Sequence, residues 1–119
     1  MLDNTFASHF AQEWIDAWNS HDMTRILAHY RDDFVMSSPK IVQIAGEPSG
    51  VLRGKPAVAA YWTTALSRLP DLRFELIGVY AGVDRVVIHY FGAGGQQAAE
   101  SFVFDSNGLV IEAAAHYAT

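Results

Sequence analysis

Two ionisable side chains in the second half of the chain, His89 and Glu100, could form a proton-transfer pair. The Gly94-Gly95 dipeptide between them is typical of a hairpin turn. If these two glycines form the whole loop, His89 lies directly opposite Glu100 on the neighbouring strand, with Cβ atoms about 4.5–5.5 Å apart. A histidine and a carboxylic acid at that distance are groups that general acid–base catalysis uses.

The side chains expected around this pair are apolar. The same register places Val87 opposite Phe102 and Phe91 opposite Ala98, on the face that carries the pair. Burial there raises the pKa of a carboxyl, whereas a protonated histidine beside it has the opposite effect. In the functional interpretation, the histidine takes or gives a proton and the glutamate orients it or acts as the acid. The alternatives are a polar pair that only tolerates burial, or a register that differs by one residue.

The composition excludes several other kinds of site. The chain has 119 residues, 13 acidic against 8 basic, and a formal net charge of −5. It contains no run of Lys or Arg, so the charge pattern of nucleic-acid binding is missing. It contains no cysteine, which excludes disulfides, thiolate metal sites and cysteine nucleophiles. The five histidines lack metal-site spacing, and we expect neither a metal nor an organic cofactor.

Nothing in the sequence indicates a membrane segment or a targeting signal. The chain begins Met-Leu-Asp-Asn, without a basic stretch before an apolar run. Its apolar runs are only a few residues long, far shorter than a membrane span. Half of the residues are hydrophobic, which argues against disorder. We therefore expect a soluble cytoplasmic protein with a single domain over residues 1–119.

Helical periodicity fills the first part of the chain. An aromatic residue recurs at every fourth position of the first predicted helix: Phe6, Phe10, Trp14 and Trp18. A second, short helix is predicted after Asp22, and a third over 54–69, ended by Pro70. Between them we predict a short strand at 34–38 and a loose hairpin or loop with short edge strands at 40–53.

After the third helix the hydrophobic period changes to two. This predicts four strands, at 72–80, 84–93, 97–105 and 109–117. Both faces of these strands are apolar, which a sheet with one solvated face would not be. We expect one face to cover a pocket and the outer face to pack against a second copy of the chain as a homodimer.

Several short motifs together resemble the nuclear transport factor 2-like superfamily and, within it, the SnoaL-like group, which includes polyketide cyclases and is similar to ketosteroid isomerase. The motifs are Trp14-x-x-x-Trp18-Asn19-x-x-Asp22, Tyr30-x-Asp32-Asp33, Ser38-Pro39, Gly54-x-x-Ala57-Val58 and Phe102-x-Phe104-Asp105-x-x-Gly108. The resemblance spans nearly the whole chain. It implies an α+β fold, a cystatin-like cone in which three helices pack on a curled, mostly antiparallel sheet around a pocket. Because such folds host both enzymes and non-enzymes, the resemblance specifies fold better than function.

Three positions can be compared with the isomerase pattern. Trp14 stands where that pattern has a tyrosine, Ser38 where it has the general-base aspartate, and Glu100 where it has a proton-donating aspartate. An indole N–H can donate a hydrogen bond, but a serine hydroxyl cannot replace a carboxylate base at neutral pH. Steroid isomerisation by the family mechanism is therefore not expected.

A pocket for a flat or cyclic ligand could be lined by aromatic side chains and their neighbours. The candidate substrate-binding residues are Trp14, Trp18, Tyr30, Met36, Ser38, Tyr61, Phe91, Phe102 and Tyr117. The alternative role is that of ordinary core residues, or of a strand end in the case of the serine. The resemblance turns Ala113, Ala115 and Tyr117 inward and leaves Glu112 and His116 outside.

Three functions fit this pattern. The first is a cofactor-free enzyme for a small apolar or cyclic molecule, an isomerase, cyclase or hydrolase that uses His89 and Glu100. The second is a non-catalytic dimeric ligand-binding module, and the third is an interaction domain whose pocket is filled by its own aromatic residues. A cavity that touches both ionisable residues would favour the enzyme.

Overall fold

The computed structural model describes residues 2–119. Its helices are α1 (Asn4–Ser20), α2 (Met23–Leu27), α3 (Pro39–Ile44) and α4 (Lys55–Arg68). Its strands are β1 (Tyr30–Ser37), β2 (Val51–Arg53), β3 (Glu75–Ala81), β4 (Arg85–Phe91), β5 (Gln97–Phe104) and β6 (Val110–Tyr117), and a short 3₁₀ turn, Ala93–Gly95, joins β4 to β5.

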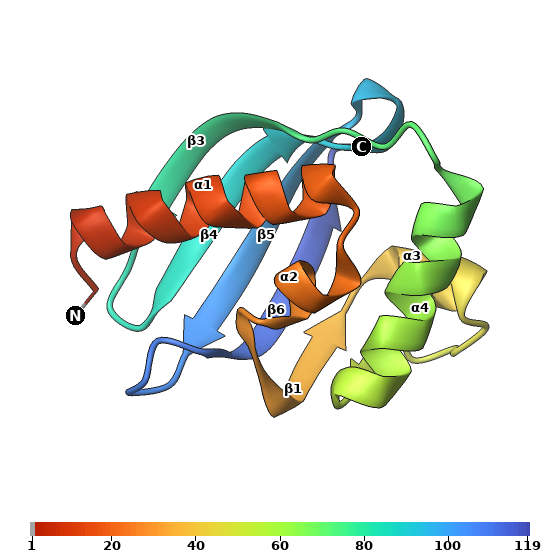
Figure 1. Ribbon diagram of the computed structural model, residues 1–119, viewed down its shortest axis with the longest axis horizontal. Helices are drawn as coiled ribbons and strands as arrows, with labels where there is room; N and C mark the ends of the chain where they lie inside the picture. The colour runs from red at the N-terminus through yellow and green to blue at the C-terminus, as the bar shows by residue number, and fades with distance from the viewer. Residues whose placement is uncertain (1) are drawn as a thin grey trace.

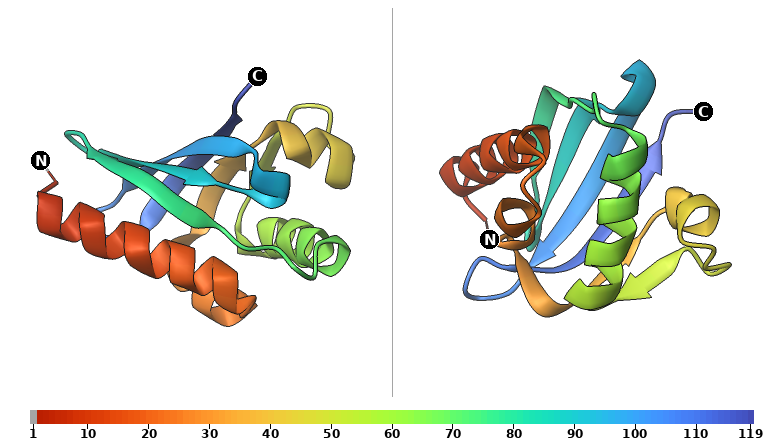
Figure 2. Two further views of the ribbon diagram at one scale, coloured as in Figure 1. Left: turned by 90° about the horizontal axis from the view of Figure 1, so that it is seen from above. Right: turned by 45° about the vertical axis from the view of Figure 1, so that its right-hand side comes forward.

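The strands form one curled sheet in the order β2-β1-β6-β5-β4-β3. Neighbouring strands are antiparallel except β1 and β6, which are parallel. The helix α1 runs across one face of the sheet, and α2 and α4 lie on the same side (Figure 1, Figure 2). The opposite face of β3, β4 and β5 carries no helix (Figure 2). This arrangement confirms the predicted α+β class, with helices packed on a curled, mostly antiparallel sheet.

The first helix, α1, is capped at both ends. Asp3 caps it, because the Asp3 side chain accepts a hydrogen bond of 2.7 Å from the backbone N–H of Phe6. It ends at His21, whose backbone adopts the left-handed conformation with φ of 58°. The aromatic stripe faces the sheet, and both of its tryptophans, Trp14 and Trp18, are buried. The expected amphipathic helix is thereby confirmed.

The segment after β1 differs from the loose hairpin that we predicted. Ser38 caps an additional helix, α3, by accepting a hydrogen bond of 3.1 Å from the backbone N–H of Lys40, and Pro39 occupies the first turn. The short strand β2 then pairs with β1, with Val35 opposite Arg53. The roles expected for Ser38 are ligand binding or the end of a strand, and neither includes this helix start, although proline is common in the first turn of a helix.

The predicted register between β4 and β5 is wrong by one residue. Phe91 pairs with Gln97, and the loop contains three residues more than the assumed Gly94-Gly95 turn. Both glycines have positive φ, 66° and 77°, which permits this longer turn. Since neighbouring residues of a strand point to opposite faces, the shift moves every β4 side chain to the other face.

His89 and Glu100 consequently do not face each other. Glu100 pairs with Ile88, and His89 pairs with Ala99. The His89 ring lies on the outer face, where Nε2 is 3.0 Å from the Gln97 side-chain oxygen. Phe91 also lies on the outer face, contrary to the prediction.

Two further findings bear on function. Among residues 2–119, no helix combines the length and hydrophobicity that crossing a bilayer requires. The same residues contain no cluster of three or more acidic, histidine or cysteine side chains arranged to hold a metal ion.

Candidate functional site

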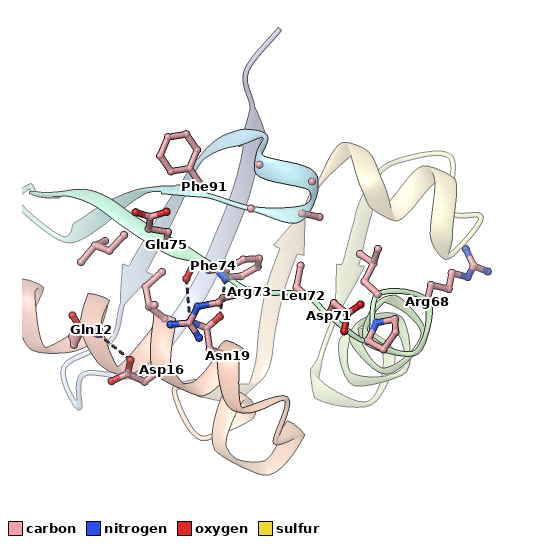
Figure 3. A pocket seen from close by; sticks show the side chains of 18 residues that line it. Gln12, Asp16, Asn19, Arg68, Asp71, Leu72, Arg73, Phe74, Glu75 and Phe91 are labelled. Carbon is pink, nitrogen blue, oxygen red and sulfur yellow. Dashed lines mark hydrogen bonds between the residues drawn. The ribbon is translucent and has the colours of Figure 1, made fainter.

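Two hollows lie next to each other at one end of the sheet. The larger is an open groove of about 1050 Å³ between α1, the segment 68–76 and the loop after β4 (Figure 3). The smaller is an inner cavity of about 70 Å³ between the sheet and the helices. The residues common to both linings are Leu69, Leu72, Phe74, Gly92 and Ala93. The two segments that contain them therefore form the wall between cavity and groove.

Two side chains from the end of α1 hold this wall. The Asn19 amide donates to the backbone oxygen of Phe74 at 3.0 Å and accepts from its N–H at 2.7 Å, as drawn in Figure 3. The His21 Nε2 lies 2.7 Å from the backbone oxygen of Leu72. These contacts fix an irregular segment whose backbone has no strand partner before β3 begins.

The inner cavity is lined mainly by aromatic and aliphatic side chains. Its wall includes Trp14 and Trp18 from α1, Met36 from β1, Tyr61 and Trp62 from α4, Tyr90 from β4, Glu100 from β5 and Tyr117 from β6. Lys40 and Ile44 of α3 close another side. Helices and strands thus both contribute to a single half-open cavity.

Glu100 is the one acidic side chain that lines this cavity within the described residues. Its side chain is buried, with 4% exposure, and Oε1 accepts a hydrogen bond of 3.1 Å from the Tyr90 hydroxyl. Burial raises the pKa of Glu100 to about 7, and the Tyr90 hydrogen bond opposes that shift. A carboxyl in this state is partly protonated at neutral pH, so it can donate or accept a proton.

Tyrosine hydroxyls surround the carboxyl. Burial and the nearby Glu100 charge raise the pKa values of Tyr30 and Tyr90 well above the ordinary value. Burial also raises the pKa of Tyr61 and of Tyr117. All four hydroxyls therefore stay protonated at neutral pH and can donate hydrogen bonds.

Trp14 has a structural role in addition to lining the cavity. Its indole N–H donates a buried hydrogen bond of 3.0 Å to the Tyr30 hydroxyl. This bond joins the middle of α1 to the first residue of β1. Trp14 also packs against Phe74 and Tyr90, with ring centroids 5.4 and 5.0 Å away. The bond and these contacts set the position of the Tyr90 ring that reaches Glu100.

Six of the eleven predicted site residues line the inner cavity: Trp14, Trp18, Met36, Tyr61, Glu100 and Tyr117. Tyr30, Ser38 and Phe102 are buried beside the cavity lining as core or capping residues. His89 and Phe91 lie on the outer face of the sheet, and Phe91 borders the groove instead. The structure thus separates the two residues predicted to act as a catalytic pair.

The prediction missed Tyr90, the residue that contacts the glutamate. The alternation in β4 contained a usable signal, because Val86, Ile88 and Tyr90 form a more apolar set than the set that includes His89. Lys40 was missed as well, because it belongs to the helix that was predicted as loop.

The SnoaL-like domain model matches residues 11–118. No curated protein matches the sequence. A SnoaL-like protein of unknown function from Burkholderia thailandensis has a solved structure that is 59% identical, with a TM-score of 0.95 and 98% of each chain covered.

Two more distant structures share the fold. A protein of unknown function with a cystatin-like fold from Methylobium petroleophilum is 23% identical, with a TM-score of 0.76, covering 99% of this chain and 79% of that one. The epoxide hydrolase/cyclase-like enzyme SalBIII, described for pyran ring formation in the polyether salinomycin, is 14% identical, with a TM-score of 0.76, covering 100% and 95%. Since the domain model covers most of the chain, the protein belongs to the SnoaL-like family and has its cystatin-like fold.

Proposed function

We propose that the protein binds a small apolar or cyclic molecule in the inner cavity and that Glu100 transfers a proton to or from it. The reaction would be a cofactor-independent isomerisation, cyclisation or hydrolysis. The observation that carries this proposal is a buried carboxyl in the cavity wall, held by the Tyr90 hydroxyl. With a pKa of about 7, both of its protonation states are populated at neutral pH, as acid–base catalysis requires.

The class of reaction is supported by analogy with a relative. SalBIII is described as epoxide hydrolase/cyclase-like, and it shares the fold of this chain. At 14% identity the likeness concerns the fold alone, so it supports a class of chemistry and assigns no residue. His89 has no part in the proposal, because its ring lies on the outer face of the sheet.

A non-catalytic ligand-binding module is the second candidate. One observation favours it: the cavity touches Glu100 but not His89, so the expected pair of ionisable residues is missing from its wall. The cavity volume of about 70 Å³ is far below the roughly 300–1,000 Å³ of typical ligand pockets. Such a cavity admits only a small ligand unless the wall shared with the groove opens. The two candidates differ in what happens to the ligand after it has bound.

The test compares two matched glutamate-to-glutamine variants. Glu100→Gln removes the proton-transfer group, and Glu112→Gln removes an exposed glutamate on β6 as the control. Each protein is incubated with a small cyclic β,γ-unsaturated ketone, a cyclic epoxide and an unsaturated alcohol epoxide, and products are identified by gas chromatography and mass spectrometry. Wild type and the control should turn over one of these, and Glu100→Gln should be slower by about 100-fold or more.

The outcomes separate the two functions. Undiminished turnover by Glu100→Gln would contradict proton transfer by this residue. Binding of an unreacted probe, detected by native mass spectrometry, together with no turnover by any variant would select the binding module instead.

The outer face of the sheet supports a proposal about assembly, namely a homodimer. Four apolar side chains gather there on β3, β4 and β5: Tyr80, Val87, Phe91 and Val103. Tyr80 is 58% exposed and Phe91 36%. Large exposed apolar side chains on a sheet face are typical of protein interfaces. Light scattering after gel filtration should give twice the monomer mass for wild type and the monomer mass for Tyr80→Glu, and a monomeric wild type would contradict the dimer.

A further inference from the structure

The polar side-chain groups of the inner cavity are predominantly hydrogen-bond donors. They comprise three indole N–H groups, an ammonium, three phenolic hydroxyls and one carboxyl: Trp14, Trp18, Trp62, Lys40, Tyr61, Tyr90, Tyr117 and Glu100. The Glu100 carboxyl already accepts a hydrogen bond from the Tyr90 hydroxyl. The buried Trp18 N–H has no hydrogen-bond partner within residues 2–119. The Trp18 N–H and the Lys40 ammonium can only donate hydrogen bonds, so a ligand with an acceptor group would satisfy them.

Lys40 is the cationic side chain in the lining of the cavity. Its Nζ lies 4.2 Å from the centroid of the Tyr117 ring, which also lines the cavity. No acidic side chain of residues 2–119 forms an ion pair with it. The other lysine of the chain, Lys55, is paired on the surface with Asp32 at 3.3 Å.

An ammonium in this position loses hydration without gaining a counterion from the protein. Burial lowers the pKa of Lys40, and the ring of Tyr117 replaces only part of the lost hydration. A carboxylate on a ligand would supply the missing charge. A phosphate dianion fits less well, because one lysine neither balances its charge nor satisfies its three acceptor oxygens.

We infer that the ligand is a small apolar monocarboxylate, whose carboxylate binds Lys40 beside Tyr117 and whose hydrocarbon body lies among the cavity aromatics near Glu100. This inference rests on the proposed function, since it names the substrate class for the same cavity. It goes beyond that proposal by requiring a charge on the ligand and a specific residue that recognises it.

Binding of an anion here has a consequence for Glu100. The titratable groups that face it from the surrounding elements are neutral tyrosines, apart from the Lys40 ammonium of the same cavity: Tyr30, Tyr61, Tyr90 and Tyr117. A second negative charge in the cavity therefore disfavours ionised Glu100. Binding at a pH above about 7 should take up a proton, because bound protein holds Glu100 in its neutral form.

The test uses two probes of nearly identical shape, benzoate and benzamide, with calorimetry at about pH 8. Wild type should bind benzoate about tenfold or more tightly than benzamide. Lys40→Met should lose this preference, since it keeps an apolar chain and removes the charge. Lys55→Met, which changes the net charge equally, should keep it. The heat of benzoate binding, measured in buffers of different ionisation enthalpy, should show that wild type takes up a proton on binding. Glu100→Gln should show no such proton uptake.

The results distinguish this inference from the proposed function. If benzamide binds as well as benzoate, or if Lys40→Met retains the preference, the carboxylate assignment is overturned while ligand binding in the cavity stands. If benzoate binding falls equally in Lys55→Met, the effect is one of net charge and the assignment is also overturned. If neither probe shifts the NMR resonances of cavity residues while wild type still turns over a ketone or an epoxide, the carboxylate assignment is overturned and the proposed function stands.

Discussion

The two ends of α1 pack against the sheet in different ways. Near its start, Phe6 and Phe10 meet Phe102 and Phe104 with ring centroids 4.8–5.0 Å apart, and the His29 ring packs against Phe10 at 5.6 Å. Near its end, Trp14 and Trp18 meet Tyr90, Trp62 and Phe74, and a buried carboxyl and a cavity lie beside them. One aromatic stripe, with a constant spacing of four, thus forms solid core at one end and a cavity wall at the other.

The difference comes from the strands rather than from the helix. Opposite the start of α1, the inner positions of β5 carry phenylalanine, which fills the space. Toward the other end, Ala98 and Glu100 of β5 and Ala115 of β6 take inner positions. Small side chains cannot fill the space between the sheet and the bulky helix, so a hollow remains. A helical stripe alone therefore cannot distinguish core from cavity.

The largest expected effect tests the solid end. Phe102→Ala should lower the free energy of unfolding by about 3–5 kcal/mol, because the surrounding rings cannot collapse into the space. Phe74→Ala, at the half-buried wall of the cavity, should cost only about 2 kcal/mol, because this side chain already borders a hollow. Urea denaturation measures both values. Equal losses would remove the distinction between the two ends.

The next effect concerns the buried carboxyl at the cavity end. Because the pKa of Glu100 is about 7 in the folded protein and 4.5 in the unfolded chain, the folded state holds more protons between these values. Stability should therefore fall as the pH rises from about 4.5 to 7, by roughly 3 kcal/mol in total. Glu100→Gln should be more stable than wild type at about pH 8 and lack this pH dependence. Parallel pH profiles for both proteins would mean that the carboxyl ionises normally.

A smaller effect is expected from the hydroxyl that contacts this carboxyl. Tyr90→Phe removes a hydrogen bond that lowers the pKa of Glu100, so that pKa should rise further. The cost in stability should be about 1 kcal/mol. Titration of the Glu100 carboxyl carbon by NMR measures the shift, and Tyr80→Phe, which alters an exposed tyrosine, serves as the control. A pKa that stays constant would show that the hydroxyl contributes nothing to the state of the carboxyl.

Much of the fold could be predicted because hydrophobic period and capping residues are local signals. The stripe of α1, the strand pattern after Pro70 and the inward face of β5 all followed from them. The helix α3 was missed, although its Ser38-Pro39 start was visible, because no apolar stripe of useful length follows. The predicted strand at 34–38 lies within β1, which begins earlier, at Tyr30.

The candidate site was predicted only in part because it depends on register. Six cavity residues were identified from the family pattern and from the face of the helix or strand on which they lie. Neither signal requires the exact pairing of the strands. Identifying the side chain that contacts Glu100 does require the exact pairing of β4 and β5. Two adjacent glycines are compatible with hairpin loops of more than one length, so they do not determine that pairing. One residue of error exchanged Tyr90 for His89 as the side chain beside the carboxyl.

The smallest effect is expected on the outer face, at His89. Its ring contacts Gln97 near the surface, on the side of the sheet away from the cavity. His89→Ala should change the free energy of unfolding of the monomer by no more than about 0.5 kcal/mol, as expected for a substitution on the monomer surface without a buried partner. Turnover and ligand binding should equal those of wild type, in contrast to Glu100→Gln. Loss of turnover in His89→Ala with an unchanged fold would mean that the outer face also takes part in function, and that inner and outer faces are not separate in their roles.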